Sequence, residues 1–369
     1  MKHLTKEHPY KNDNLLLKSV FKKDTLFFDI ETTGFSALSS SLYLIGCAYH
    51  KKDTLIVEQF FAENPSEEGI LLKEFLSLAK SFSTLCCFNG TTFDLPYLHA
   101  KCEQCHLENT LADKEVFDIY RQVFRYKKLF HLESLRLKSL EKFLGIDRED
   151  QFDGKELISV YRRYQKAPTA SEEQFLLLHN YEDIVNMLPL CNVLSYPYFF
   201  QHHFSITDIF FHDKESDYSL DDLQDGKSLT FLLKPDYPFP KEFSLQNEYA
   251  TLIGKGTEAV LQIPVFSGTL LHFLPDYKNY YYLPEEDTAI HKSVASFVEK
   301  THRKQASAAT CYIKKEGEFL PQPKELVTPS FFKKYKDSVS YFLLPEGLVK
   351  TDSVWEQYCF CIIKELSKS

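Results

Sequence analysis

The order of apolar segments in the first half of the chain is its most restrictive feature. Strand-like segments follow one another at 25–30, 41–49 and 54–61, and a fourth lies at 84–88 after an amphipathic stretch. Helical patterns occupy 66–80, 94–105, 132–145, 154–165 and 170–192. Three consecutive strands, then a helix, a strand and further helices predict a mixed α/β sheet with flanking helices.

The texture of the sequence changes near residue 194, and we expect a linker at about 194–206 between domains 1–200 and 206–369. In the second domain, strand patterns occupy 228–234, 250–254, 259–266, 270–274 and 339–344, with a hairpin over 311–319 and helices over 285–303 and 352–366. The acidic stretch 213–225 predicts a solvated loop. This pattern indicates a C-terminal α+β domain.

Composition limits the classes of function. The 52 acidic residues exceed the 43 Lys and Arg, and the net charge of -9 argues against binding of nucleic acid by bulk charge. A local basic groove remains compatible with this balance. Nine cysteines in 369 residues are too few for a disulfide scaffold. Without an apolar run of about 20 residues or an apolar leader, we expect a cytoplasmic protein with no membrane association.

Four acidic residues stand at element ends or in apolar surroundings. Asp29 and Glu31 close the first strand and, being two residues apart, share a face. Asp94 opens the helix after the fourth strand, and Asp183 lies in the last helix of the domain, one turn after His179. Taken singly, they are compatible with a polar strand end, a helix cap and a structural His–Asp pair.

Together these acids form a recognisable set. The segments Asp29-Ile30-Glu31-Thr32-Thr33-Gly34, Asn89 to Asp94, and Asp183 resemble the three motifs of the DEDD superfamily of 3′–5′ exonucleases. Segments 140–148 and 154–156 are similar to predicted exonucleases of YprB type. The resemblance covers about residues 20–195 and implies a ribonuclease H-like α/β fold. It also implies metal-dependent hydrolysis at the 3′ end of single-stranded DNA or RNA.

The resemblance further implies a metal centre that holds two Mg²⁺ or Mn²⁺ ions. Asp29 would bridge both ions, Glu31 and Asp183 would hold the ion that activates water, and Asp94 would support the other. Phosphodiester hydrolysis fits such a site, because two cations about 3.5–4 Å apart stabilise the attacking and leaving oxygens. Carboxylates are the ligands that these hard cations prefer.

The third motif departs from the superfamily pattern. One branch has Tyr four residues before the Asp, and the other has His five residues before it. Here Leu178 and His179 occupy those positions, so the spacing is that of the tyrosine branch and the residue is histidine. His179 is the candidate catalytic base, with an ordinary pKa of about 6.5. Tyr181 is the alternative, and on a helix it lies about 200° around from His179.

Candidate substrate-binding residues surround the acids. Thr32, Thr33 and Gly34 follow the first motif, and Asn89 begins the second. Arg121 and Arg125 belong to a basic stretch interleaved with aromatic residues, which is compatible with a phosphate track and equally with a solvated helix face. Asp118 is expected to be structural. The Cys102-x-x-Cys105-His106 pattern of haem attachment is set aside, because that chemistry belongs to exported proteins.

The leading hypothesis is therefore a metal-dependent 3′–5′ exonuclease in residues 1–200. The C-terminal domain would position substrate or recruit a protein partner. Two alternatives stay open at this point. One is a nucleic-acid-binding or scaffold protein on the same fold whose catalysis has decayed, and the other is a structure-specific endonuclease.

Overall fold

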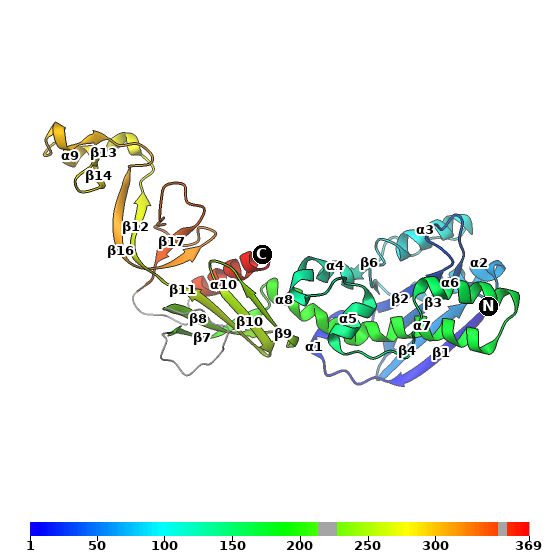
Figure 1. Cartoon of the computed structure of the whole chain (residues 1–369). Helices are drawn as coiled ribbons and strands as arrows, with labels where there is room; N and C mark the ends of the chain where they lie inside the picture. The colour runs from blue at the N-terminus through cyan, green and yellow to red at the C-terminus, as the bar shows by residue number, and fades with distance from the viewer. Residues whose placement is uncertain (213–226, 346–352, 369) are drawn as a thin grey trace. The chain divides into compact units, whose positions relative to one another are not determined.

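The structure is a computed structural model that describes residues 1–212, 227–345 and 353–368. The predicted loop 213–225 and position 352 of the predicted last helix lie outside the described residues. The chain divides into two compact units, Met1–Tyr198 with Phe239–Lys241, and Phe199–Pro238 with Glu242–Ser369. Figure 1 shows the elements of each unit.

A six-stranded mixed sheet forms the centre of the first unit. Its strands are β1 (Lys2–Pro9), β2 (Thr25–Thr32), β3 (Leu42–Lys51), β4 (Thr54–Phe61), β5 (Thr84–Cys87) and β6 (Glu115–Asp118). They lie in the order β1-β4-β3-β2-β5-β6. The pairs among β1, β4, β3 and β2 are antiparallel, whereas β5 runs parallel to β2 and β6 parallel to β5. The predicted mixed sheet with flanking helices is confirmed.

The helices of this unit cover both faces of the sheet. They are α1 (Leu15–Val20), α2 (Glu68–Ala79), α3 (Asp94–Gln104), α4 (Ile119–Val123), α5 (Leu137–Leu144), α6 (Gly154–Lys166), α7 (Ala170–Leu190) and α8 (Ser195–Phe200). Helices α2 and α3 pack on Phe28 and its neighbours, and α6 and α7 pack on Tyr43 and Phe61. Since side chains alternate along β2, Asp29 and Glu31 point away from the face of Phe28 and toward α7.

A glycine allows α7 to approach the sheet closely. Gly46 of β3 pairs with Asp29 of β2. A Cβ atom at position 46 would lie 2.2 Å from the side-chain oxygen of Asn180 in α7 and 2.8 Å from Ile184. The missing side chain therefore brings the helix that carries the third motif directly over the strand that carries the first.

The second unit is an antiparallel β-rich region. Its strands are β7 (Phe204–His212), β8 (Ser228–Pro235), β9 (Phe239–Gln246), β10 (Thr251–Gly256), β11 (Glu258–Pro264), β12 (Phe266–Phe273), β13 (Tyr280–Leu283), β14 (Thr288–His291), β15 (Lys304–Gln305), β16 (Tyr312–Gln322) and β17 (Ser340–Leu343). Its helices are the short α9 (Lys292–Ala295) and α10 (Ser353–Leu366). Helix α10 packs its Trp355 and Tyr358 rings on Phe231 of β8 and Phe342 of β17.

Three local predictions for this region differ from the structure. The predicted helix over 285–303 is wrong, because β14 pairs with β13 and only α9 and a short 3-10 helix at Lys300–His302 are helical in that range. The predicted hairpin over 311–319 is also wrong. Gly317 pairs with Gly268 of β12 in the middle of β16, so this glycine continues a strand. The expected linker 194–206 carries α8 and the start of β7.

Within the described residues, no helix combines the length and the apolar character needed to cross a bilayer.

Candidate metal centre

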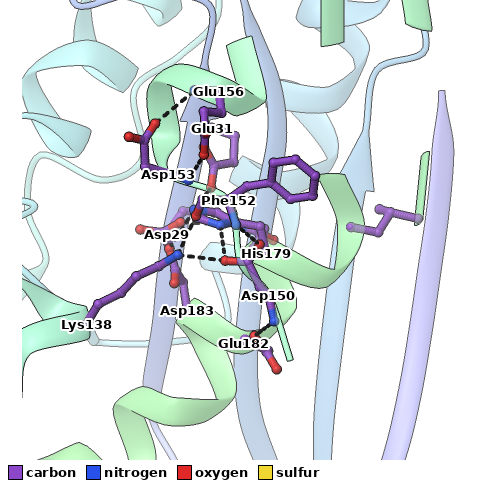
Figure 2. A network of polar contacts seen from close by, with 12 residues as sticks. Asp29, Glu31, Lys138, Asp150, Phe152, Asp153, Glu156, His179, Glu182 and Asp183 are labelled. Atoms are coloured by element: carbon purple, nitrogen blue, oxygen red, sulfur yellow. Dashed lines mark hydrogen bonds and ion pairs between the residues drawn. The ribbon is translucent and has the colours of Figure 1, made fainter. Parts of the chain in front are cut away.

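The first two acids lie together at the end of β2 (Figure 2). Glu31 is 9% exposed. Asp29 is half-buried, and its Oδ2 accepts a hydrogen bond of 3.1 Å from the side-chain amide of Asn180 in α7. The Asn180 oxygen in turn accepts from Gln59 of β4 at 3.0 Å. This buried amide pair fixes Asp29 against the helix of the third motif.

The third acid reaches the same place from the other side of the sheet. The chain leaves β5 at Cys87 and turns into α3, whose first residue is the buried Asp94. The backbone N–H of Ile30 donates to the Asp94 carboxylate, which ties α3 to β2. A Cβ atom at Gly90 would lie 2.7 Å from the Cys87 sulfur and 3.0 Å from Asp94 Oδ2, so this tight turn requires glycine.

Helix α7 supplies the remaining two groups. His179 is 5% exposed, and its Nε2 lies 3.5 Å from Glu31 Oε1 and 3.4 Å from Asp183 Oδ2. One donor atom from each of Glu31, His179 and Asp183 lies within 4.8 Å of the others, so this cluster could bind a metal ion. The structure thus brings Asp29, Glu31, Asp94, His179 and Asp183 together from one strand and two helices.

The carboxylates repel one another strongly. Burial and the charges of Asp183, Glu31 and Asp94 raise the pKa of Asp29 well above its ordinary value. Burial, with Asp183 and Asp94, raises the pKa of Glu31 to about 7, although the nearby His179 lowers it. Burial, with the charges of Asp118 and Asp183, raises the pKa of Asp94 to about 7 against backbone hydrogen bonds that lower it. A cation among these oxygens would relieve the repulsion, so the donor set fits divalent metal ions.

Arg148 is a buried cation that sequence reasoning did not assign to the site. It lies in the segment between α5 and α6, and its Nη2 donates to Asp183 Oδ1 at 2.5 Å. Its Nη1 donates to both carboxylate oxygens of Glu141 at 3.0 Å, and its Nε lies 3.4 Å from Glu182. Although burial lowers it, these acids raise the pKa of Arg148 overall.

Asp150 is the second residue that sequence reasoning missed. Its Oδ2 lies 2.7 Å from His179 Nδ1 and 2.8 Å from Lys138 Nζ. Although burial raises it, the hydrogen bonds from His179 and Lys138 hold the pKa of Asp150 well below its usual range. Although burial lowers it, the hydrogen bond to Asp150 and the charge of Glu31 raise the pKa of His179. Glu141 and Arg148 belong to the YprB-like segment, which was the available signal for these contacts.

The predicted substrate residues of the first motif form a loop beside Glu31. The hydroxyl of Thr32 donates to the Gly34 carbonyl at 2.9 Å. The hydroxyl of Thr33 accepts from the Ser41 N–H at 2.8 Å. All three residues of this loop are half-buried. Their predicted contact with substrate stays a prediction.

Asp118 connects the second motif to the basic stretch. It accepts from the backbone N–H of Asn89 at 2.9 Å and of Thr91 at 3.1 Å, and its side chain caps α4 through the Arg121 N–H. The expectation that Asp118 is structural agrees with these bonds. Asn89 is held in a left-handed backbone conformation, with φ of 63°.

Arg121 and Arg125 are exposed beside an open pair of aromatic rings. The Tyr120 and Phe124 rings stack with centroids 6.3 Å apart, and the Arg125 guanidinium lies 5.7 Å from the Phe124 centroid. Phe124 is 45% exposed. In residues 1–212, no hydrogen bond or ion pair joins either arginine to the acid cluster. This surface is therefore separate from the metal centre and linked to it through Asp118.

Tyr181, the alternative base, is placed on another face of α7. Its hydroxyl lies 2.8 Å from His8 Nε2 on β1, and the Lys6 ammonium sits 4.1 Å from the centroid of its ring. These contacts fix the Tyr181 ring against β1. His179, in contrast, faces Glu31 of β2 and Asp183, which lies one turn further along α7.

Comparison with known proteins agrees with the fold of the first unit. Residues 26–195 match the sequence pattern of the RNase H superfamily. These residues form an RNase H-like domain. The chain is also a distant homologue of the uncharacterized protein YprB of Bacillus subtilis, with 27% identity over 180 residues. That alignment covers 48% of this chain and 43% of YprB, so the chain spans less than half of its relative.

Solved structures resemble the chain at low identity. The family B DNA polymerase of Pyrobaculum calidifontis is 12% identical, with 71% of this chain and 38% of the polymerase covered and a TM-score of 0.36. The Aedes aegypti Nibbler EXO domain is 16% identical, with 50% and 83% covered and a TM-score of 0.31. Exonuclease I of E. coli, in complex with a dT13 oligonucleotide, is 13% identical, with 62% and 54% covered and a TM-score of 0.29.

Proposed function

We propose that the RNase H-like domain is a metal-dependent 3′–5′ exonuclease that hydrolyses phosphodiester bonds of single-stranded DNA or RNA. One observation carries the proposal. Four acids from three distant sequence motifs converge in a buried cluster in which the pKa values of Glu31 and Asp94 are raised to about 7. A cluster of carboxylates that repel one another in this way is stable at neutral pH when bound cations neutralise their charges.

The chemistry of the donor set indicates hard cations. Asp29, Glu31, Asp94 and Asp183 would hold Mg²⁺ or Mn²⁺, which supplies a nucleophilic hydroxide and neutralises charge on the phosphate oxygens. His179 would accept the proton of the attacking water through Nε2, the ring nitrogen that faces Glu31 and Asp183. The 3′–5′ direction rests on the resemblance of the three motifs to the DEDD superfamily.

The surface around Phe124 would receive the strand upstream of the cleaved end. An exposed ring stacked on Tyr120, with Arg121 and Arg125 beside it, offers a stacking platform and cations for phosphates. Because Asp118 holds both this surface and the Asn89 loop, a strand bound here would be fixed relative to the acids.

The test uses 5′-labelled single-stranded DNA and RNA with Mg²⁺ or Mn²⁺. We expect a ladder that shortens from the 3′ end with the wild-type chain, and no products with Asp29→Asn or with a chelator. Asp53→Asn, in the exposed turn between β3 and β4, is the matched control and should cleave normally.

Other outcomes would assign a different function. Cleavage of a circular single strand would indicate an endonuclease, since a circle has no 3′ end. Binding without cleavage in either metal, by wild type and Asp29→Asn alike, would contradict the nuclease and favour a binding or scaffold protein.

A further inference from the structure

Asp150 holds His179 from the side opposite to the acid cluster. The segment between α5 and α6 folds back onto α7, where the backbone N–H groups of Glu149 and Asp150 donate to Glu182 at 2.8 and 3.0 Å. The Asp150 side chain is only 1% exposed. Its Oδ2 meets His179 Nδ1 at 2.7 Å, and its Oδ1 accepts from the Phe152 N–H at 3.0 Å (Figure 2). The carboxylate is therefore fixed by both backbone and side chains.

The charges around Asp150 determine what it can do. Lys138 Nζ lies 2.8 Å and Arg148 Nη2 3.5 Å from Oδ2, so two cations face this carboxylate. An ionised carboxylate accepts hydrogen bonds and cannot donate them. The proton in the contact of 2.7 Å must then reside on His179 Nδ1, so whenever the ring is neutral its Nε2 carries no proton.

We infer that Asp150 is a positioning residue, which fixes the His179 ring so that the Nε2 lone pair faces Glu31 and Asp183. The inference rests on the proposed nuclease function for its catalytic consequence. It holds whether Nε2 takes a proton from water or binds a metal ion, since both roles need the lone pair at that atom. A carboxylate on the far nitrogen of a histidine commonly sets the tautomer and orientation in this way.

The decisive variant is Asp150→Asn. The Asn amide has the same shape, but its NH₂ group can donate to Nδ1, which places the ring proton on Nε2 and removes the lone pair from the cluster. Asp153→Asn is the matched control. Asp153 is exposed in the same segment and caps α6 through the N–H groups of Lys155 and Glu156. Asn is an equally good cap, so this control should behave as wild type.

The first readout is the ¹⁵N NMR spectrum of the full chain labelled at histidine, without metal, at a pH where the ring is neutral. The His179 signals are identified by their loss in His179→Gln. We expect the Nδ1–H tautomer in wild type, Asp153→Asn and the conservative Asp150→Glu, and the Nε2–H tautomer in Asp150→Asn. An Nε2–H tautomer in wild type would overturn the inference, whatever the variants do.

The second readout is single-strand cleavage. We expect kcat to fall by about 100-fold or more in Asp150→Asn with KM nearly unchanged, with partial recovery in Asp150→Glu. Equal rates for Asp150→Asn and Asp153→Asn would contradict the positioning role. If no variant cleaves and the tautomers follow the expectation, the nuclease proposal fails while the assignment of Asp150 stands.

Discussion

The two sides of the acid cluster are held by different kinds of interaction. On the α7 side, charged side chains hold the cluster: Arg148 donates to Asp183, and the Asp150 carboxylate forms a hydrogen bond with the His179 ring. On the α3 side, backbone groups do it: the Ile30 N–H donates to Asp94, and Asp118 accepts from the loop that precedes α3. In residues 1–212, no ion pair reaches Asp94.

This difference means that the negative charges on the two sides are compensated in different ways. The α7 side carries its own positive charge, so Asp183 has a partner before any metal arrives. The α3 side leaves Asp94 compensated by dipoles alone, and its pKa is raised to about 7. We therefore expect stability on the α7 side to depend on the buried cation, and stability on the α3 side to depend on hydrogen bonds and on bound metal. Four predictions test this contrast.

The largest effect is expected from Arg148→Met. The substitution leaves the buried Glu141 and the half-buried Asp183 without their cation, which should lower the free energy of unfolding by about 3–5 kcal/mol. Urea denaturation with a chelator measures it. Mg²⁺ should reduce the loss, because a metal ion replaces the missing charge beside Asp183.

The control for this variant is Arg163→Met, which breaks an exposed ion pair with Glu172 at 2.9 Å. Exposed pairs contribute at most about 1 kcal/mol. Equal losses in the two variants would contradict the importance of the buried cation on the α7 side.

On the α3 side, Asp118→Ala should lower the free energy of unfolding by about 2–3 kcal/mol. It removes the cap of α4 and the acceptor for the N–H groups of Asn89 and Thr91. The loss should be the same with and without Mg²⁺, since no charge is left unpaired. Asp113→Ala, at an exposed position before β6, should have little effect. A loss that Mg²⁺ repairs would refute the contrast with Arg148.

The same contrast explains what the sequence could predict. Asp29, Glu31 and Asp94 stand next to strand ends, where local patterns place them, and the mixed sheet followed from the order of apolar segments. Arg148 and Asp150 lie in an irregular segment whose contacts with α7 span 29 to 35 residues. Such contacts depend on how the chain folds back after Gly145. The YprB-like segment points to Arg148, but no local pattern says which residues of α7 it or Asp150 would contact.

The errors also have physical causes. Strand β1 escaped prediction because Lys2, Lys6 and Glu7 break the apolar pattern, as is usual for an exposed edge strand. The hairpin at Gly317 was predicted from the turn preference of glycine. In the structure, the Leu343 side chain lies 2.7 Å from where a Cβ atom of residue 317 would be. The close approach of this side chain to the backbone is therefore the reason for glycine at this position.

The pH dependence of stability without metal is the third prediction. Glu31 and Asp94 have pKa values of about 7 in the folded chain, above the ordinary 4.5 and 3.8. The folded state therefore binds more protons than the unfolded state between about pH 4 and 7. Stability should be greatest below this window and fall as pH rises through it. Melting temperatures in a chelator test this fall, and Mg²⁺ should flatten the curve. If the stability of wild type rose with pH over this window when measured against that of Asp94→Asn, the raised pKa values of Glu31 and Asp94 would be contradicted.

The last prediction compares the same substitution on the two sides at neutral pH without metal. Asp94→Asn removes a charge that only dipoles compensate, so it should raise the free energy of unfolding by about 1 kcal/mol. Asp183→Asn removes the ionised partner of Arg148 at 2.5 Å, so it should lower that free energy by about 1 kcal/mol. Urea denaturation of both variants measures the difference, and both should lose nuclease activity. Opposite signs would establish that the two sides are compensated differently. A loss of stability in both variants would mean that Arg148 serves the whole cluster, and that the repulsion at Asp94 is already relieved by that cation. A gain in both would mean that Arg148 does not compensate Asp183.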